Sequence, residues 1–370
     1  MKGRKGKGEK NSALSVNKGV EQPPSVNPEL LTKFRKKRRK SYSVDEYFEQ
    51  IRTGNRTVLS QVITLIESSR PEHYRIAQAI IEKCLPFSQN SIRIGITGVP
   101  GAGKSTFIEA LGKNATSLGR KLAVLTIDPS SEQSGGSILG DKTRMETLAS
   151  DPDAYIRPSP AAGTLGGVAR KTRETIIVCE AAGFDTIFVE TVGVGQSETL
   201  VHSMVDFFLL LMLAGAGDEL QGIKRGIMEM ADAIAITKAD GSNTDRAGIA
   251  GVEYRNALQL FPPQKSGWHP RVMTCSALEL KGITEIWDMI NEQVNMTVEN
   301  GAFKERRRSQ AVYRMHENIA DNLKKSFYTD PEVLKLLPQL EKKLLKGDIT
   351  SYRAASKMLN KYFKNNGKKE

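Results

Sequence analysis

The sequence predicts an α/β fold whose central sheet is mostly parallel. Between Ser91 and about Val298, short apolar segments alternate with longer stretches that have helical periodicity. The short segments are apolar at nearly every position, which suits parallel strands covered by helices on both faces. The candidate strands are Ile92–Thr97, Leu122–Ile127, Thr186–Glu190, Phe207–Leu213, Ala233–Thr237 and Val272–Cys275. We interpret the piece Asp128–Gly167 as a long loop, and loops of such length in a compact domain are often functional.

Helical segments flank this α/β region on both sides. Residues Ser43–Glu46 form a capping box, a common signature of a helix start. Near the C-terminus, apolar residues recur at helical spacing, as between Tyr352 and Tyr362. Such a stripe packs either against its own domain or against another subunit, and the pattern leaves both open. We divide the chain into a tail at 1–42, an N-terminal helical segment at 43–90, an α/β domain at 91–300 and a helical extension at 301–370.

The positive net charge is concentrated at the amino end. Residues 1–40 contain 13 Lys or Arg and 3 Glu, and so carry +10 of the net charge of +12. We interpret the tail as a solvated, disordered segment, with contact to phosphate or to an acidic partner as the alternative. Because the rest of the chain is nearly neutral, a nucleic-acid partner is not favoured.

Apolar runs and cysteine positions indicate the compartment. The longest apolar run, Phe207–Leu213, is much shorter than the roughly 20 residues of a membrane helix, and no apolar segment typical of secretory signals opens the chain. Cys84, Cys179 and Cys275 are far apart, as expected for unpaired thiols in a reducing compartment. We therefore expect a cytoplasmic protein without a membrane partner.

One segment carries a specific chemical signature. Residues 98–106 match the pattern G-x-x-x-x-G-K-[ST] and lie between a predicted strand and a predicted helix, the context that this pattern requires. The glycines let backbone N–H groups turn toward phosphate, Lys104 reaches the β- and γ-phosphate oxygens, and the Ser105 hydroxyl can ligate Mg²⁺. The sequence therefore predicts a P-loop NTPase domain. Its predicted phosphate-loop residues are Gly98, Val99, Pro100, Gly101, Ala102, Gly103, Lys104, Ser105 and Thr106.

Acidic residues follow two other predicted strands. Asp128 and Glu190 each end a strand, and ligands of open parallel sheets bind at the carboxyl ends of the strands. A strand-end acid can also cap a helix, but together with Asp141 of the long loop these residues favour binding of Mg²⁺ and water. Gly193 can present its N–H group to a γ-phosphate. We predict catalytic roles for Lys104, Asp128, Glu190 and Gly193, and Mg²⁺ coordination by Ser105, Asp128, Asp141 and Glu190.

The segment Thr237-Lys238-Ala239-Asp240 follows another apolar strand and predicts recognition of guanine. A carboxylate here can accept hydrogen bonds from the N1–H and 2-amino groups of guanine, which adenine lacks, and the Lys238 stem can lie over the ring. The tetrapeptide alone is a weak signal. It comes, however, after a phosphate loop and before a Ser276-Ala277 pair at the end of the next strand. Together these features predict GTP as the substrate.

These motifs together resemble the MeaB/ArgK (methylmalonic aciduria type A) family of G proteins, GTPase chaperones of cobalamin-dependent acyl-CoA mutases. The resemblance runs from about Ser43 to the C-terminus and is densest over Gly95–Glu285. It is carried by GITGVPGAGKSTFIEALG, IDPSSEQSGGSILGDKTRM, FVETVGVGQSE, AGAGDELQGIKRGI, ITKAD and CSALELKGI. The second segment and those around Glu190 and Gly217 are much more specific to the family than the phosphate loop.

The resemblance implies roles for individual positions. It implies that Lys104 and Ser105 bind phosphate and Mg²⁺. It also implies a further switch segment at 215–225 and a homodimer formed through a C-terminal helical arm. By their positions in the family motifs, Asp128, Asp141 and Glu190 are implied to surround the metal ion and its water molecules. The implied guanine pocket is Lys238 and Asp240, completed by Ser276, Ala277 and Leu278. The chain departs from the family at Thr237, where Asn is usual, so a carboxamide contact is lost while specificity rests mainly on Asp240.

The resulting expectation is a Mg²⁺-dependent GTPase that acts as a chaperone of an adenosylcobalamin-dependent acyl-CoA mutase. Methylmalonyl-CoA mutase is the expected partner, and the GTPase would gate cofactor loading and protect the enzyme. One alternative is a metal-insertion GTPase of the same superfamily, which needs clustered His and Cys ligands. The sequence has no Cys and His pair at metal-ligand spacing. The other is a P-loop kinase, which the guanine signature disfavours.

Overall fold

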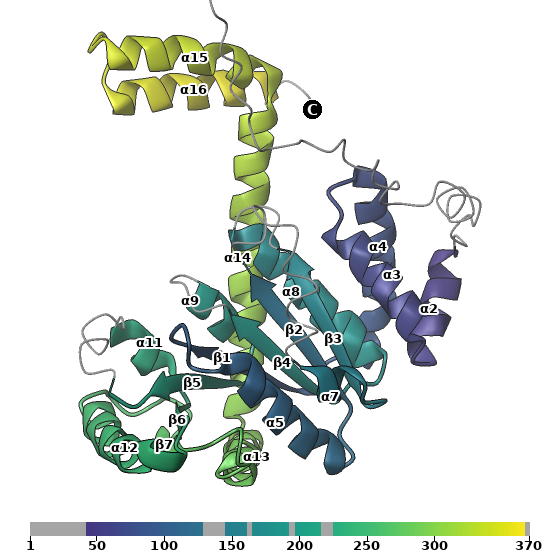
Figure 1. The fold of residues 1–370 in the computed structure, drawn as a ribbon. Coiled ribbons are helices and arrows are strands. Elements are labelled where there is room, and N and C mark those ends of the chain that lie inside the picture. Colours follow the sequence, from purple (N-terminus) through teal and green to yellow (C-terminus); the bar gives the residue numbers. More distant parts are fainter. Residues whose placement is uncertain (1–41, 129–144, 161–164, 192–196, 216–224, 367–370) are drawn as a thin grey trace, which may run out of the picture. The chain divides into compact units, whose positions relative to one another are not determined.

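A seven-stranded parallel sheet forms the centre of the protein, in a computed structural model that describes residues 42–128, 145–160, 165–191, 197–215 and 225–366 (Figure 1). The strand order is β3-β2-β4-β1-β5-β6-β7. The strands are β1 (Ile92–Gly98), β2 (Leu122–Asp128), β3 (Ala154–Pro160), β4 (Thr186–Thr191), β5 (Phe207–Leu213), β6 (Ala233–Thr237) and β7 (Arg271–Thr274). The predicted α/β class with a parallel sheet is confirmed, and β1 lies between β4 and β5.

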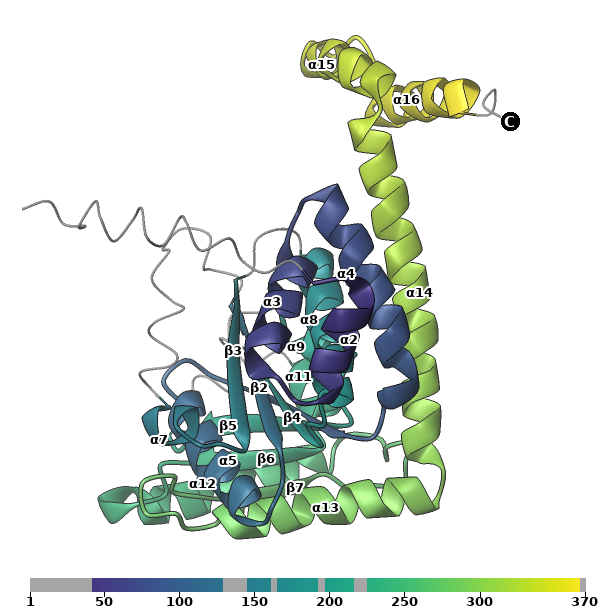
Figure 2. The same cartoon turned by 90° about the vertical axis from the view of Figure 1, so that its right-hand side faces the viewer.

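Helices cover both faces of the sheet (Figure 2). One face carries α5 (Lys104–Ser117), α7 (Glu146–Ala149) and α13 (Ile283–Glu299), and the other carries α8 (Leu165–Ala181), α9 (Ser197–His202), α11 (Arg225–Met230) and α12 (Thr244–Leu258). In β5, Leu209 and Leu211 pack on the first face, while Leu210 and Met212 pack on the second. Because successive strand residues alternate between the faces, a strand covered on both sides is apolar throughout.

The stretch interpreted as the loop Asp128–Gly167 contains regular structure in its described part. Both α7 and β3 lie there, so the interpretation as a loop is wrong for these residues. Pro158 and Pro160 concealed the strand, because proline lacks the N–H group that a central strand donates. The strand β3 tolerates them because it lies at the edge of the sheet, where it pairs with β2.

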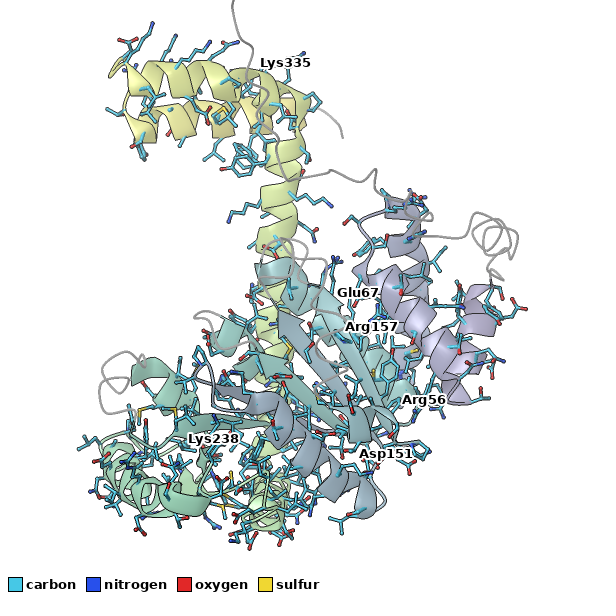
Figure 3. The ribbon with its side chains drawn as sticks, viewed as in Figure 1. Arg56, Glu67, Asp151, Arg157, Lys238 and Lys335 are labelled. Carbon is cyan, nitrogen blue, oxygen red and sulfur yellow. The ribbon has the colours of Figure 1, made fainter. Side chains whose placement is uncertain are left out.

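Within the described residues, three α-helices precede the sheet. The helices α2 (Val44–Arg52), α3 (Arg56–Glu67) and α4 (Pro71–Cys84) pack on one another and on α8, and the short helix η1 (Leu85–Phe87) leads to β1. Glu67 and Arg157 form an ion pair between α3 and β3 (Figure 3). The hydroxyls of Ser60 and Tyr155 lie 3.0 Å apart. These contacts fix the N-terminal helices to the edge of the sheet that β3 forms.

Helix α14 (Ala302–Thr329) is fixed to the sheet by charged side chains near its start. The Arg307 guanidinium donates to the two carboxylate oxygens of buried Asp206, which precedes β5, at 2.8 and 2.7 Å. Beyond α14, the helices α15 (Pro331–Leu345) and α16 (Ser351–Asn366) pair through a small apolar core (Figure 2). None of the helices in the described ranges is long and apolar enough to span a membrane.

Candidate functional site

Glycines shape the loop between β1 and α5. A Cβ on Gly98 would lie 2.4 Å from the carbonyl oxygen of Leu211 in β5, so only glycine fits at the end of β1. Gly101 and Gly103 have φ angles of 79° and 77°, in the left-handed region that side chains disfavour. The loop can thereby turn its N–H groups inward ahead of α5. Among the other predicted loop residues, Ala102 is buried, Val99 is half-buried, and Pro100 and Thr106 are exposed.

Lys104 is the first residue of α5 and reaches back over the loop. Its ammonium group donates to the carbonyl oxygens of Gly98 and Val99 at 3.0 and 3.2 Å. Burial lowers the pKa of Lys104, and the carboxylates of Glu190 and Glu198 oppose that shift. The lysine therefore lies inside the loop, close enough to two carboxylates for them to influence its titration.

The Glu190 carboxylate reaches the same place from β4, the neighbour of β1. Ile96 and Glu190 are register partners, so β4 ends beside the start of the phosphate loop. The Ser105 hydroxyl donates to Glu190 Oε1 over 3.5 Å, and the hydroxyls of Thr97 and Thr191 lie 2.8 Å apart. Hydroxyl and carboxylate oxygens are the hard ligands that Mg²⁺ takes, so Ser105 and Glu190 fit that metal.

A second buried carboxylate, Glu198, is a site residue that the sequence analysis missed. It lies on α9, is 5% exposed, and influences the pKa of Lys104. Folding brings it there because α9 packs against both β1 and β4. Its position in the family-specific segment FVETVGVGQSE was the available signal, but within that segment the strand-end rule selected only Glu190.

The turns after β6 and β7 hold the residues predicted to bind the base. The Ser276 hydroxyl donates to Asp240 Oδ2 at 2.6 Å, and Ser276 is fully buried. Lys238 has a φ of 56°, and its Cε lies 3.8 Å from the position that a Cβ on Gly103 would take (Figure 3). The structure thus brings Lys238 beside the phosphate loop. Ala277 is half-buried and Leu278 is 79% exposed, in the turn that the Ser276–Lys281 bridge closes.

Thr237 makes a contact that the sequence analysis did not foresee. Its buried hydroxyl donates to the carbonyl oxygen of Ala102 in the phosphate loop at 2.8 Å, and it lies 3.1 Å from the carbonyl oxygen of Met212. The hydroxyl ties the end of β6 to the phosphate loop. Threonine at this position therefore keeps a direct link to the loop without a carboxamide.

Several predicted residues cannot be placed in this site. Asp141, Gly193 and residues 216–224 of the predicted switch at 215–225 lie outside the described residues. Asp128 ends β2 with its backbone paired to Pro160, and only its backbone is described.

The described arrangement defines a class of protein. A glycine loop joins a central parallel strand to a helix, and a lysine, a serine and a carboxylate from the adjacent strand gather at that loop. This strand–loop–helix arrangement with its lysine and serine is that of a P-loop NTPase.

Comparisons with known proteins define the family. The family described as Methylmalonyl Co-A mutase-associated GTPase MeaB matches residues 59–332. A Mycobacterium tuberculosis protein named as a probable GTPase is 48% identical over 317 residues, which are 86% of this chain and 94% of that protein. The methylmalonic aciduria type A homolog, mitochondrial, of Mus musculus is 44% identical over 329 residues, covering 86% of this chain and 79% of that protein.

A solved structure is also similar along most of the chain. The crystal structure of a LAO/AO transport system kinase has a TM-score of 0.70 and 35% identity, and the match covers 86% of this chain and 97% of that one. The chain belongs to the MeaB family and is a GTPase. The family resemblance, the P-loop fold and the enzyme class predicted from the sequence are therefore confirmed.

Proposed function

We propose that Lys104, Ser105 and Glu190 form the centre at which this GTPase hydrolyses GTP. The observation that carries the proposal is their meeting at the carboxyl ends of β1 and β4. Lys104 can exchange its two loop carbonyls for phosphate oxygens and so place a positive charge where negative charge develops. Ser105 and Glu190 would hold Mg²⁺, which neutralises phosphate charge when bound. The predicted roles of Asp128, Asp141 and Gly193 remain part of this proposal.

Substitution of Lys104 tests this assignment. Lys104→Ala should abolish turnover and leave the fold intact, because only the loop loses its cation. Lys113→Ala is a matched control, since Lys113 lies on the same helix and pairs with Asp151 away from the loop. Release of free phosphate without an added acceptor separates hydrolysis from a kinase reaction. GTP hydrolysis by Lys104→Ala at the wild-type rate would exclude Lys104 from the chemistry.

Guanine selection is proposed for Asp240 and Lys238. The Ser276 hydroxyl fixes the orientation of the Asp240 carboxylate, which can then accept from the N1–H and 2-amino groups of the base. The end of the Lys238 side chain lies near Gly103 of the phosphate loop. Its alkyl stem can therefore lie over the flat face of a base bound beside that loop. The corresponding test is to compare GTP with ATP and xanthosine triphosphate as substrates of the wild type and of Asp240→Asn.

We further propose that GTP turnover serves an adenosylcobalamin-dependent acyl-CoA mutase, gating cofactor loading and protecting the enzyme. Membership of the MeaB family supports this proposal, as does the similar protein named for methylmalonic aciduria type A. GTP turnover of the full chain should rise when purified methylmalonyl-CoA mutase is added. Co-elution of the two proteins should depend on which nucleotide is bound. No stimulation and no complex with any acyl-CoA mutase would contradict the chaperone role and leave the GTPase assignment intact.

The helices after α14 support the proposal of a homodimer. An apolar groove of about 640 Å³ runs between α14, α15 and α16. Several large apolar side chains of α15 and α16 are exposed, among them Leu345 at 89%, Tyr352 at 82% and Phe363 at 62%. A second copy of the chain can cover such a surface.

Truncation tests the dimer. Removal of all residues after Asp330 should give a monomer in light scattering that still binds GTP. The cut is placed beyond α14 because the start of that helix carries Arg307, the partner of buried Asp206. A full-length protein that is monomeric at micromolar concentrations would contradict the proposal.

A further inference from the structure

A pocket of about 850 Å³ lies at the amino end of β1, the end of that strand away from the phosphate loop. Its walls come from η1 and the segment before β1, from β1 itself, from α8, from the end of α13 and from the first half of α14. Five of its lining residues are cationic: Arg93, Lys304, Arg307, Arg308 and Arg314. None of the described residues that line it is acidic. The volume is within the range of about 300–1,000 Å³ that holds small organic ligands.

Two of the arginines already have carboxylate partners behind the pocket wall. Arg93 donates to Glu180 through Nε and one terminal nitrogen, at 2.8 and 3.0 Å. Arg307 pairs with Asp206 in the same way, and all four side chains are buried. These pairs are electrically neutral, so they build the wall of the pocket and do not by themselves demand a ligand.

In the part of the chain that the structure describes, Arg314 has no such partner. Its Nε donates to the backbone carbonyl of Gln310 at 3.1 Å, and within the described residues no carboxylate forms an ion pair with it. Burial, together with the neighbouring guanidiniums of Arg93 and Arg173, lowers the pKa of Arg314 to about 10, while the Glu180 carboxylate opposes that shift. A half-buried guanidinium without a carboxylate partner is costly unless an anion compensates it.

The backbone at the mouth of the pocket is also unusual. Gln89 has a φ of 77°, a left-handed conformation that glutamine rarely adopts. It is held there because its N–H donates to Glu180 at 2.8 Å while its carbonyl accepts from Arg307 at 2.6 Å. Strained residues held by a surrounding network are concentrated at binding sites.

We propose that this pocket binds an organic phosphate: a dianionic phosphate group attached to an apolar or aromatic body. Arg314 and Lys304 are two cations without a carboxylate partner among the described residues. They lie about 15 Å apart along α14, so the Arg314 guanidinium can contact the phosphate group while Lys304 adds to the positive potential of the pocket, which favours a dianion. The apolar part of the ligand has a surface to contact, since Leu85, Val298 and Phe303 line the same pocket. The site is separate from the GTP site and does not depend on the mutase proposal.

The test uses the full chain saturated with GDP and Mg²⁺, so that the phosphate loop is occupied. Phenyl phosphate is titrated by calorimetry, and inorganic phosphate and benzoate are titrated in parallel. Saturable binding of phenyl phosphate, tighter than that of the other two, is expected. Arg314→Gln should weaken it by roughly ten-fold or more, because a charge-assisted hydrogen bond is lost. Arg75→Gln, an exposed arginine on α4, should leave it unchanged.

Thermal unfolding distinguishes a binding role from a structural one. Without phosphate, Arg314→Gln should be at least as stable as the wild type, because the substitution removes a half-buried cation that has no carboxylate partner among the described residues. Phenyl phosphate should raise the unfolding temperature of the wild type and not that of the variant. The proposal is overturned if no phosphate compound binds the GDP-loaded wild type, if Arg314→Gln binds as tightly, or if benzoate binds best.

Discussion

The Thr237 hydroxyl should contribute to nucleotide affinity by holding the phosphate loop in place. Thr237→Val keeps the shape of the side chain and removes the donor that bonds Ala102 at 2.8 Å. A neutral hydrogen bond contributes about 0.5–1.5 kcal/mol net, and a buried carbonyl left without a donor costs about 1–3 kcal/mol. We therefore expect the nucleotide-bound state to lose about 1–2 kcal/mol of free energy, which corresponds to a 5- to 30-fold weaker affinity for nucleotide.

Titration with a fluorescent GDP analogue measures the loss of nucleotide affinity. Thermal unfolding in the absence of nucleotide shows how much the substitution destabilises the folded protein itself. Thr274→Val is the matched control, since Thr274 is an exposed threonine at the end of β7. Thr237→Asn introduces the residue that is usual in the family and should retain affinity if its amide can donate to the same carbonyl. Equal affinity and equal unfolding temperature for Thr237→Val and Thr274→Val would refute the reasoning.

Two further predictions concern stability. Burial and the charge of Arg306 lower the pKa of His202 to about 4 in the folded protein, below the value of about 6.5 in the unfolded chain. Because the unfolded chain takes up the proton first, the free energy of unfolding should fall as the pH is lowered from about 6.5 to about 4. Relative to His202→Gln, the wild type should lose about 1–3 kcal/mol of unfolding free energy across that window in urea titrations; parallel pH profiles would contradict this. Arg307→Leu leaves the Asp206 charge buried and should cost roughly 3–5 kcal/mol in the same assay. Arg308→Leu, at an exposed position, should change the unfolding free energy little, and an equal loss in both variants would contradict the anchoring role.

The features that the sequence predicted well are encoded locally. The glycine spacing before Lys104 is set by the conformation that a phosphate loop must adopt, so it is visible in nine consecutive residues. The strands β1, β4 and β5 are covered on both faces and were recognisable from their short, largely apolar sequences, of which β5 is apolar throughout. The Glu190 position followed from the rule that parallel strands present their carboxyl ends to the ligand.

The features that escaped the sequence depend on contacts between distant segments. The edge position of β3 makes Pro158 acceptable, and nothing in the local sequence shows which strand lies at an edge. Glu198 approaches Lys104 only because α9 packs on β1 and β4. The Thr237 contact with Ala102 requires the end of β6 to meet the phosphate loop. The pairing of Arg307 with Asp206 likewise joins α14 to the segment before β5, across 101 residues of sequence.

We propose above that this GTPase recognises guanine through Asp240, and exchange of the nucleobase tests that role most directly. Steady-state kcat/KM is measured for GTP, ATP and xanthosine triphosphate with the wild type and with Asp240→Asn. The wild type should prefer GTP. The variant should lose roughly ten- to a hundred-fold on GTP, because a charge-assisted bond is lost, and should gain on xanthosine triphosphate, since its amide N–H can donate to the 2-oxo group. Equal use of ATP and GTP by the wild type, or an unchanged preference in Asp240→Asn, would contradict the account.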